Sequence, residues 1–299
     1  MHIPKLDAAS VGWPTTRSGI SFFPIYLACN DLPEIATGAS ADLGISEMED
    51  ASVQSLNAYN PSNAPVLIVE GEHFLGGKQN RGFNATILVP AHTTLKVPVS
   101  CLEQGRWNAR RPFRRSNMHS PWNVRRQTQE GVADSMANRG SRRGEQRRVW
   151  REVERTLHDA RADSPTASAA DAEQRIARNT SLASNIEELA RLGPLPGQCG
   201  MAITHGHWIA AIEIFGSEAL FKAHWGSLTR SHMLANPDVR RRPSATSVLS
   251  VLRSLGSAES SDSDAVGLGT EQRISNDRWV GQALTLDGNL VHGSFFAKH

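Results

Sequence analysis

The sequence contains little cysteine, and the cysteines it has are scattered. Cys29, Cys101 and Cys199 form no C-x-x-C pair, and their number is odd. These features argue against a disulfide framework and against a zinc site of the cysteine type. Three isolated thiols fit a reducing compartment.

A long apolar run is also missing. The most apolar early segment, residues 20–29, is short and contains Pro24, whereas a membrane-spanning helix needs about 20 apolar residues. Residues 1–5 do not have the composition of a signal peptide. We therefore expect a cytoplasmic protein without a membrane partner.

The chain has little excess charge, because its net charge is only +2. Positive charge is nevertheless concentrated in one segment. Residues 106–155 contain 14 arginines, no lysine and 5 acidic residues, so this segment carries a net charge of +9. Its aromatic residues are few: Phe113 and Trp122 could stack on bases, whereas Trp150 fits a helix core. No helix-turn-helix, RNP or zinc-finger pattern occurs. We expect a solvated helical face, and keep contacts to nucleic-acid phosphates as an alternative.

Familiar catalytic motifs are absent too. There is no G-x-S-x-G or H-E-x-x-H, and Gly267-x-Gly269 lacks the third glycine of a dinucleotide-binding loop. His205-x-His207 is the one close histidine pair outside the expected helices, and His224 fits an apolar helix face. We expect no metal, and the residues point to no particular cofactor.

The first third of the chain is rich in predicted strands. The chain is long enough to bury a core without disulfides or metal. Residues 93–101 alternate, which places Leu95, Val97, Val99 and Cys101 on one face. Further strands are expected at residues 20–27, 53–59, 65–70 and 84–89, with turns at residues 60–63 and at Gly76-Gly77. Pro24 suggests that its strand lies at a sheet edge.

The middle of the chain has helical periodicity. Val149, Val153 and Leu157 recur at helical spacing, and a later helix ends at Gly193-Pro194.

The last third is mixed. We expect a hairpin around His205-Gly206 and another at Asp287-Gly288. A helix capped by Ser217 should end at Asn236-Pro237. A short helix at 247–255 and a loop at 257–264 follow.

The predicted fold class is α+β. Residues 1–115 form an antiparallel, β-sandwich-like part, and residues 116–195 form a helical, arginine-rich connector. Residues 196–299 form an α+β part with antiparallel hairpins. The three parts can pack as one domain.

One candidate site is the run from Gly76 to Arg81. Two adjacent glycines let backbone amides approach a ligand closely. Lys78, Asn80 and Arg81 would add donors suited to phosphate or carboxylate, and Gln79 lies between them. The spacing is not that of a Walker loop, and the alternative is a polar turn exposed to solvent.

A second cluster follows the strand at residues 93–101. Glu103 continues its buried face, so it needs a partner such as Arg106 or Arg81, or else its pKa rises. It is either an acid or base tuned for proton transfer or half of an internal ion pair. Cys101 is the other catalytic candidate, against the alternative of an inert buried thiol.

These segments carry a family resemblance. Residues 70–107 read EGEHFLGGKQNRGFNATILVPAHTTLKVPVSCLEQGRW, and MAITHGHWIAAIEIFG, VGLGTEQRI and VHGSFF follow in order. The chain resembles the bacterial family of ARG- and rhodanese-phosphatase-superfamily-associated proteins, formerly a domain of unknown function. The family is named for genomic neighbours that include ADP-ribosylglycohydrolases. The resemblance therefore implies a place in NAD-derived or ADP-ribose metabolism.

The expected function is binding or processing of an ADP-ribose-like or other phosphorylated nucleotide. Lys78, Arg81 and Arg106 would hold phosphates, and Trp107 would stack on a base or close the pocket. Glu103 would be the acid or base if the protein is an enzyme. The resemblance also carries Gln79, Asn80 and Cys101 over as site positions. The alternatives are a non-enzymatic scaffold or regulatory partner of a neighbouring hydrolase, and a nucleic-acid-associated protein.

Overall fold

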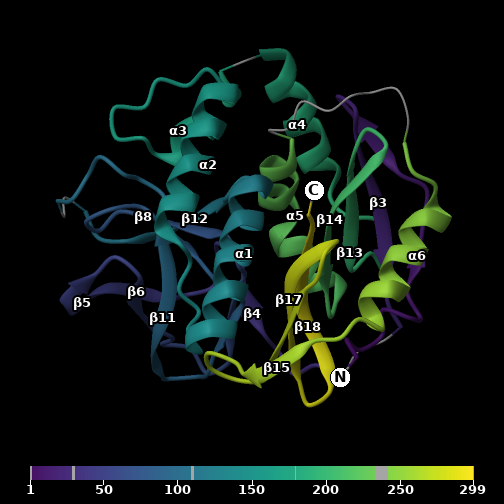
Figure 1. Cartoon of the computed structure of the whole chain (residues 1–299), viewed down its shortest axis with the longest axis horizontal. Coiled ribbons are helices and arrows are strands. Elements are labelled where there is room, and N and C mark those ends of the chain that lie inside the picture. Colours follow the sequence, from purple (N-terminus) through teal and green to yellow (C-terminus); the bar gives the residue numbers. More distant parts are fainter. Residues whose placement is uncertain (1, 29–30, 109–110, 179, 234–241, 299) are drawn as a thin grey trace. The chain divides into compact units, whose positions relative to one another are not determined.

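The computed structural model describes residues 2–28, 31–108, 111–178, 180–233 and 242–298 (Figure 1). These residues are 27% helical and 35% in strands, and nearly all strand pairs are antiparallel, which confirms the α+β class. Within the same ranges, no helix is long and apolar enough to cross a membrane. Cys29 and Asn236-Pro237 lie outside the described residues.

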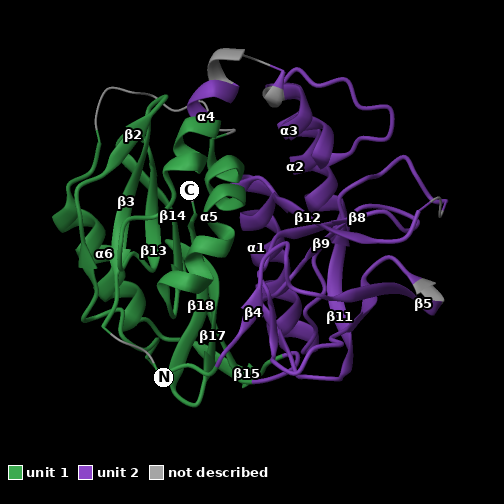
Figure 2. Ribbon diagram, turned by 180° about the vertical axis from the view of Figure 1, so that it is seen from behind, with its two compact units in different colours: residues 1–33, 187–265, 269–299 green, residues 34–186, 266–268 purple. Residues whose placement is uncertain are grey.

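The chain divides into two compact units, coloured separately in Figure 2. Unit 1 comprises residues 1–33, 187–265 and 269–299, and unit 2 comprises residues 34–186 and 266–268. This division differs from the boundaries expected at residues 115 and 195. The reason is that an early strand, β3 (Ile20–Tyr26), pairs with β13 (Gly200–His205) in the last third of the chain.

Unit 1 is built on one nine-stranded sheet. Its strands, in spatial order, are β1 (Ser10–Val11), β3, β13, β14 (Trp208–Phe215), β18 (Asn289–Ala297), β17 (Trp279–Leu286), β16 (Thr270–Ser275) and β15 (Ser261–Asp264), with β2 (Thr15–Arg17) also on β3. Both predicted hairpins are present, and at the second one Asp287 and Gly288 have φ values of 49° and 76°. Residues 261–264 were expected in a loop; they form an edge strand that pairs with β16, although their side chains are polar.

Helices cover both faces of this sheet (Figures 1 and 2). On one face, α6 (Ala245–Gly256) buries Val248 and Leu252 against Ile25 and Ile212. On the other, α5 (Glu218–His232) places Phe221 beside Phe215 of β14, with ring centroids 5.6 Å apart. The Ser217 hydroxyl caps α5 by accepting the Leu220 amide, as expected.

Pro24 does not mark a sheet edge, so that expectation was wrong. On the side of β3 away from β13, β1 pairs at residues 25–26 and β2 at residues 20–22. The Pro24 carbonyl accepts the Gly12 amide in the break between these two short strands. In a strand, the backbone nitrogen and the carbonyl of one residue point to the same side. The Pro24 nitrogen therefore faces this break, where no N–H is needed to pair with a neighbouring strand.

Unit 2 contains two smaller sheets whose side chains share a core. The six-stranded sheet has the order β12 (Arg114–His119), β8 (Glu72–Leu75), β9 (Arg81–Phe83), β11 (Thr94–Cys101), β6 (Ser55–Tyr59) and β5 (Gly44–Ser52). The three-stranded sheet has the order β10 (Ile87–Val89), β7 (Val66–Ile68) and β4 (Ala36–Thr37). Val97, Val99 and Phe83 of the first sheet pack with Ile68 and Val89 of the second.

Helices α1 (Trp122–Arg139), α2 (Gln146–Asp159), α3 (Ala169–Ala177) and α4 (Thr180–Leu192) complete the middle of the chain. Val149, Val153 and Leu157 are buried, as their spacing predicts, and α4 ends directly before Gly193. Residues 116–119 were expected to lie at the start of this helical region. Together with residues 114–115 they instead form the edge strand β12, which pairs with β8.

Leu252→Ala should test the packing of α6. Leu252 is fully buried in the unit 1 core, so its truncation should lower the free energy of unfolding by about 2–5 kcal/mol. Urea denaturation measures this change. The exposed neighbour Ser254→Ala is the control, and equal effects of both substitutions would contradict the packing described here.

Candidate functional site

The pairing of β9 with β11 brings the two predicted segments together. Arg81 lies opposite Cys101 in the register of these strands. Beyond the ladder, the Leu102 amide donates to the Asn80 carbonyl at 3.0 Å, and Gln79 Nε2 donates to the Glu103 carbonyl at 2.7 Å. The GGKQNR and VSCLEQGRW segments therefore form one cluster in unit 2.

The Gly76-Gly77 turn serves packing within the protein. Both residues have positive φ, and a Cβ on Gly77 would lie 2.1 Å from the Phe113 ring. The turn amides are also engaged: Gly76 N donates to Asn80 Oδ1, Gly77 N to Arg111 O and Lys78 N to Glu47 Oε1. A cradle of free amides for phosphate is therefore not what these glycines provide.

Glu103 and Arg106 form an internal ion pair. Arg106 Nη2 donates to Glu103 Oε2 at 2.6 Å, and Nη1 donates to the Gly77 carbonyl at 2.7 Å. Burial raises the pKa of Glu103, but hydrogen bonds from Arg106, Thr166 and the Asn80 amide together outweigh it and hold this pKa below its usual value. Glu103 is thus ionised at neutral pH, and both of its oxygens are bonded.

Cys101 has the environment of an unreactive thiol. It is buried, and burial raises its pKa to about 11 although the Arg81 guanidinium favours the thiolate. The thiol contacts Gln79 Oε1 as a donor, and Arg81 Nη1 lies 2.5 Å from Sγ. This geometry favours the inert alternative over a nucleophile.

Arg81 is a side chain of the cluster whose hydrogen bonds are incomplete. It is fully buried, and its Nη1 donates to Gln79 Oε1 at 2.9 Å. Its Nε and Nη2 have no hydrogen-bond partner among the described residues. The guanidinium lies 5.7 Å from the centre of the Trp107 ring, and Lys78 Nζ lies 5.3 Å from it. Two cations therefore flank one indole, whose residue is 48% exposed.

An incompletely bonded buried guanidinium is costly. Burying an unpaired polar group costs roughly 1–3 kcal/mol by mutational data, and an unpaired charge costs more. An anion that approached Nε and Nη2 could form two parallel hydrogen bonds, the geometry for which arginine is suited. The arrangement can therefore hold a phosphate or carboxylate group.

Three arginines of the basic segment bond carboxylates inside unit 2. Arg125 bonds Glu70 at 2.8 Å with both side chains fully buried, and Arg115 bonds Glu72 at 2.9 Å. Together with Arg106 and Glu103, three acidic residues each bond a different arginine. Part of the local positive charge thus stabilises this unit.

A buried His73–Ser120 pair was not anticipated from the sequence. His73 Nε2 lies 2.8 Å from Ser120 Oγ, the distance of a hydrogen bond. Burial lowers the pKa of His73 to about 3, although the neighbouring Glu72 carboxylate opposes this shift. Such an imidazole is too weak a base to activate a serine.

A polar row on the unit 1 sheet was also missed. Glu213, Ser294, Gln282 and Arg273 occupy consecutive cross-strand positions of β14, β18, β17 and β16, and all are buried. Two imidazoles flank Glu213, with His232 Nε2 at 3.5 Å and His292 Nε2 at 3.7 Å. Alternating polar residues suggest a solvent-facing side, so burial could not be deduced from them. No group of three or more His, Cys, Asp or Glu in the described ranges could hold a metal ion.

Glu103→Gln should destabilise the protein at neutral pH. Removing the charge weakens the hydrogen bonds that the buried carboxylate accepts. The free energy of unfolding should therefore fall by about 1.5–3 kcal/mol. The pKa of Glu103 is lower in the folded than in the unfolded protein. Its contribution to the free energy of unfolding is therefore present above the unfolded pKa of about 4.3 and is lost as the pH falls from there through the folded pKa.

Urea denaturation at pH 7 and in acid measures this difference, which should shrink in acid. The control is Glu145→Gln, which removes an exposed pair with Arg148 and should change stability little. A pH-independent difference for Glu103→Gln would contradict the assignment.

His73 should remain neutral in the folded protein down to pH 4. Since its folded pKa lies below its unfolded pKa of about 6.5, stability should fall by about 2 kcal/mol between pH 7 and pH 5. His73→Gln should remove this part of the pH dependence in urea titrations. His158→Gln, whose side chain is 90% exposed, should leave it intact, and an NMR titration of His73 near pH 6.5 would refute the prediction.

Comparison with known proteins gives one result. Searches of curated proteins and of solved structures found no match to this chain. A family model described as the ARG and Rhodanese-Phosphatase-superfamily-associated Protein domain matches residues 8–296. This span includes the clustered segments of unit 2 and nearly all of unit 1. The chain therefore belongs to the ARG and Rhodanese-Phosphatase-superfamily-associated Protein family.

Proposed function

We propose that the Arg81 cluster of unit 2 binds a phosphorylated nucleotide of the ADP-ribose type. The observation that carries the proposal is the buried Arg81 guanidinium, whose Nε and Nη2 lack partners among the described residues. Lys78 adds a second cation beside the Trp107 ring. The choice of an ADP-ribose-like ligand follows the resemblance described above and is tested below.

The cluster divides the work of binding among three side chains. Arg81 bonds phosphate oxygens through Nε and Nη2, and Lys78 contributes a nearby charge. Trp107 presents a half-exposed ring on which a base can stack. It already lies over the Arg81 guanidinium, so the ligand enters by displacing or sliding along this ring.

The remaining predicted residues hold the cluster in place. Arg106 bonds Glu103 and the carbonyls of the glycine turn, and Asn80 bonds Gly76 and Ser168. Gln79 supports Arg81 and the Glu103 backbone. These contacts favour a role in positioning.

The chemistry of the cluster supports recognition better than turnover. Glu103 is ionised and bonded through both oxygens, and Cys101 remains a thiol because burial raises its pKa to about 11. Neither group is arranged to move a proton to or from a bound ligand. We infer binding of the nucleotide as the function of this cluster.

Thermal-shift titration with ADP-ribose, NAD, AMP and inorganic phosphate tests the proposal. A ligand at 100 times its Kd should stabilise the protein by about 2.7 kcal/mol, enough to raise Tm by several degrees. Arg81→Met should abolish the shift with every phosphate compound. Trp107→Ala should weaken the binding of nucleotides more than that of inorganic phosphate, because only nucleotides stack on the ring.

Arg139→Ala is the matched control, since Arg139 is an exposed arginine of the same unit. Its Tm shifts should equal those of the original chain. Circular dichroism should first establish that Arg81→Met is folded. No shift with any of the four compounds, or an undiminished shift in folded Arg81→Met, would refute the proposal.

A further inference from the structure

Exposed apolar side chains gather at one place on unit 1. Among the described residues, five large apolar side chains are exposed: Trp13, Tyr59, Trp107, Leu192 and Leu195. Trp13, Leu192 and Leu195, at 88%, 62% and 51% exposure, line a single pocket. Such a concentration marks a contact surface, whereas single exposed apolar residues need no explanation.

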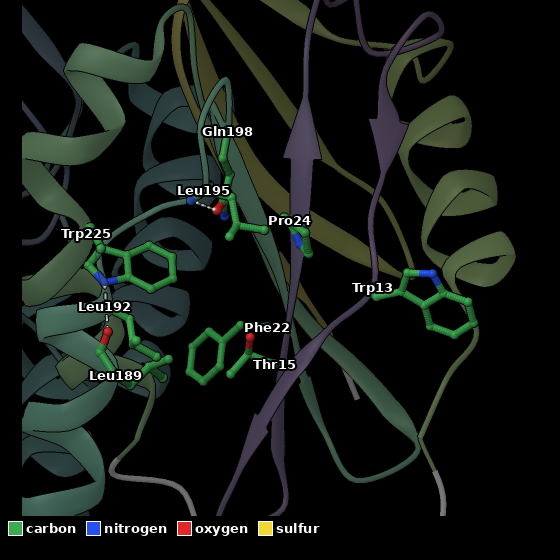
Figure 3. Close-up of a pocket in the computed structure, with 10 residues that line it drawn as sticks. Trp13, Thr15, Phe22, Pro24, Leu189, Leu192, Leu195, Gln198 and Trp225 are labelled. Carbon is green, nitrogen blue, oxygen red and sulfur yellow. Dashed lines mark hydrogen bonds between the residues drawn. The ribbon is translucent and has the colours of Figure 1, made fainter.

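The pocket has apolar walls (Figure 3). Phe22 and Pro24 of β3 form one wall, and Leu189 of α4 and Trp225 of α5 contribute to the other. Its volume is about 140 Å³. An apolar cavity of about 150 Å³ accommodates a benzene ring, so this pocket has the size of an aromatic ring.

Two polar side chains around the pocket, Trp225 and Gln198, already have partners. Trp225 Nε1 donates to the Leu189 carbonyl at 3.1 Å. Gln198 Oε1 accepts the Leu195 amide at 2.9 Å, and its Nε2 donates to the Gly200 carbonyl at 2.8 Å. An occupant therefore gains mainly from apolar burial, and a charged group would lose its hydration without compensation.

Trp13 is an aromatic side chain of matching size on the rim of the same pocket. It lies between β1 and β2, and in Figure 3 its ring stands apart from the other lining side chains. Burying a tryptophan removes about 150–250 Å² from water, which makes it a strong anchor. Nearby, Arg17 and Glu188 form a partly exposed ion pair at 3.1 Å, as polar groups do at an interface rim.

We propose that this face of unit 1 binds a second copy of the chain, with Trp13 of each copy inserted into the pocket of the other. The ring and the pocket occur side by side on one surface, so a two-fold axis brings both pairs into contact at once. The chain thus carries both the occupant and the receptor. This inference is independent of nucleotide binding, because it uses residues of unit 1 alone.

The small area of the contact indicates weak association between the two copies. Two tryptophans bury about 300–500 Å² and the pocket walls a comparable area, which places the total at the low end for specific interfaces. We therefore expect a reversible dimer with a Kd in the micromolar range rather than a permanent one.

Sedimentation velocity from about 1 to 200 µM tests this inference. The original chain should shift from monomer toward dimer across this range. Trp13→Ala should raise the Kd at least about tenfold, because it removes both anchors. Leu192→Arg should do the same by placing a charge at the mouth of the pocket. Both positions are exposed, so the variants should fold.

Tyr59→Ala is the matched control, since Tyr59 is an exposed aromatic residue of unit 2 that does not line the pocket. It should leave the Kd within about twofold. A chain that stays monomeric at 200 µM would overturn the inference, as would dimerisation undiminished in Trp13→Ala. A monomer whose Tm rises with added indole would overturn it in favour of a small-molecule pocket.

Discussion

The antiparallel pairing of β9 with β11 holds the Arg81 cluster of unit 2 together. This register sets Arg81 opposite Cys101 and draws the following residues into contact with the glycine turn. The pairing buries the guanidinium completely, and among the described residues only one of its three nitrogens has a hydrogen-bond partner. The neighbouring Glu103–Arg106 pair fixes the turn from the other segment. The cluster thus combines a rigid frame with one incompletely bonded cation.

Arginine serves two purposes in this unit. Arg106, Arg115 and Arg125 each bond a buried carboxylate, so they neutralise charge and stabilise local packing. Arg81 contacts an amide oxygen and a thiol instead, neither of which carries a compensating charge. Since a buried guanidinium with unfilled hydrogen bonds is unfavourable, this contrast supports the proposed ligand-binding role of Arg81.

Local patterns in the sequence predicted much of the fold. The strand at 93–101, the Val149–Val153–Leu157 stripe, the Ser217 cap and the Asp287-Gly288 turn depend on neighbouring residues, and all are present. The pairing of β3 with β13 was not predictable, because it joins segments far apart in sequence. The edge strands β12 and β15 carry mostly polar side chains and leave no alternating apolar pattern.

The site was predicted in part. Two segments were expected to supply one site, and they do lie together, but roles within it depend on distances that spacing cannot give. Only the structure distinguishes Arg106, whose Nη1 and Nη2 bond the turn and Glu103, from Arg81, whose Nε and Nη2 have no partner in the part of the chain that the structure describes. The buried row around Glu213 was missed because alternation alone does not show whether a polar face is covered.

A crystal structure of the chain with ADP-ribose tests the central claim most directly. The account predicts phosphate oxygens about 2.7–2.9 Å from Arg81 Nε and Nη2, with Trp107 in contact with the base. Bound nucleotide elsewhere on the chain, with Arg81 still enclosed by Gln79, Cys101 and Trp107, would contradict it.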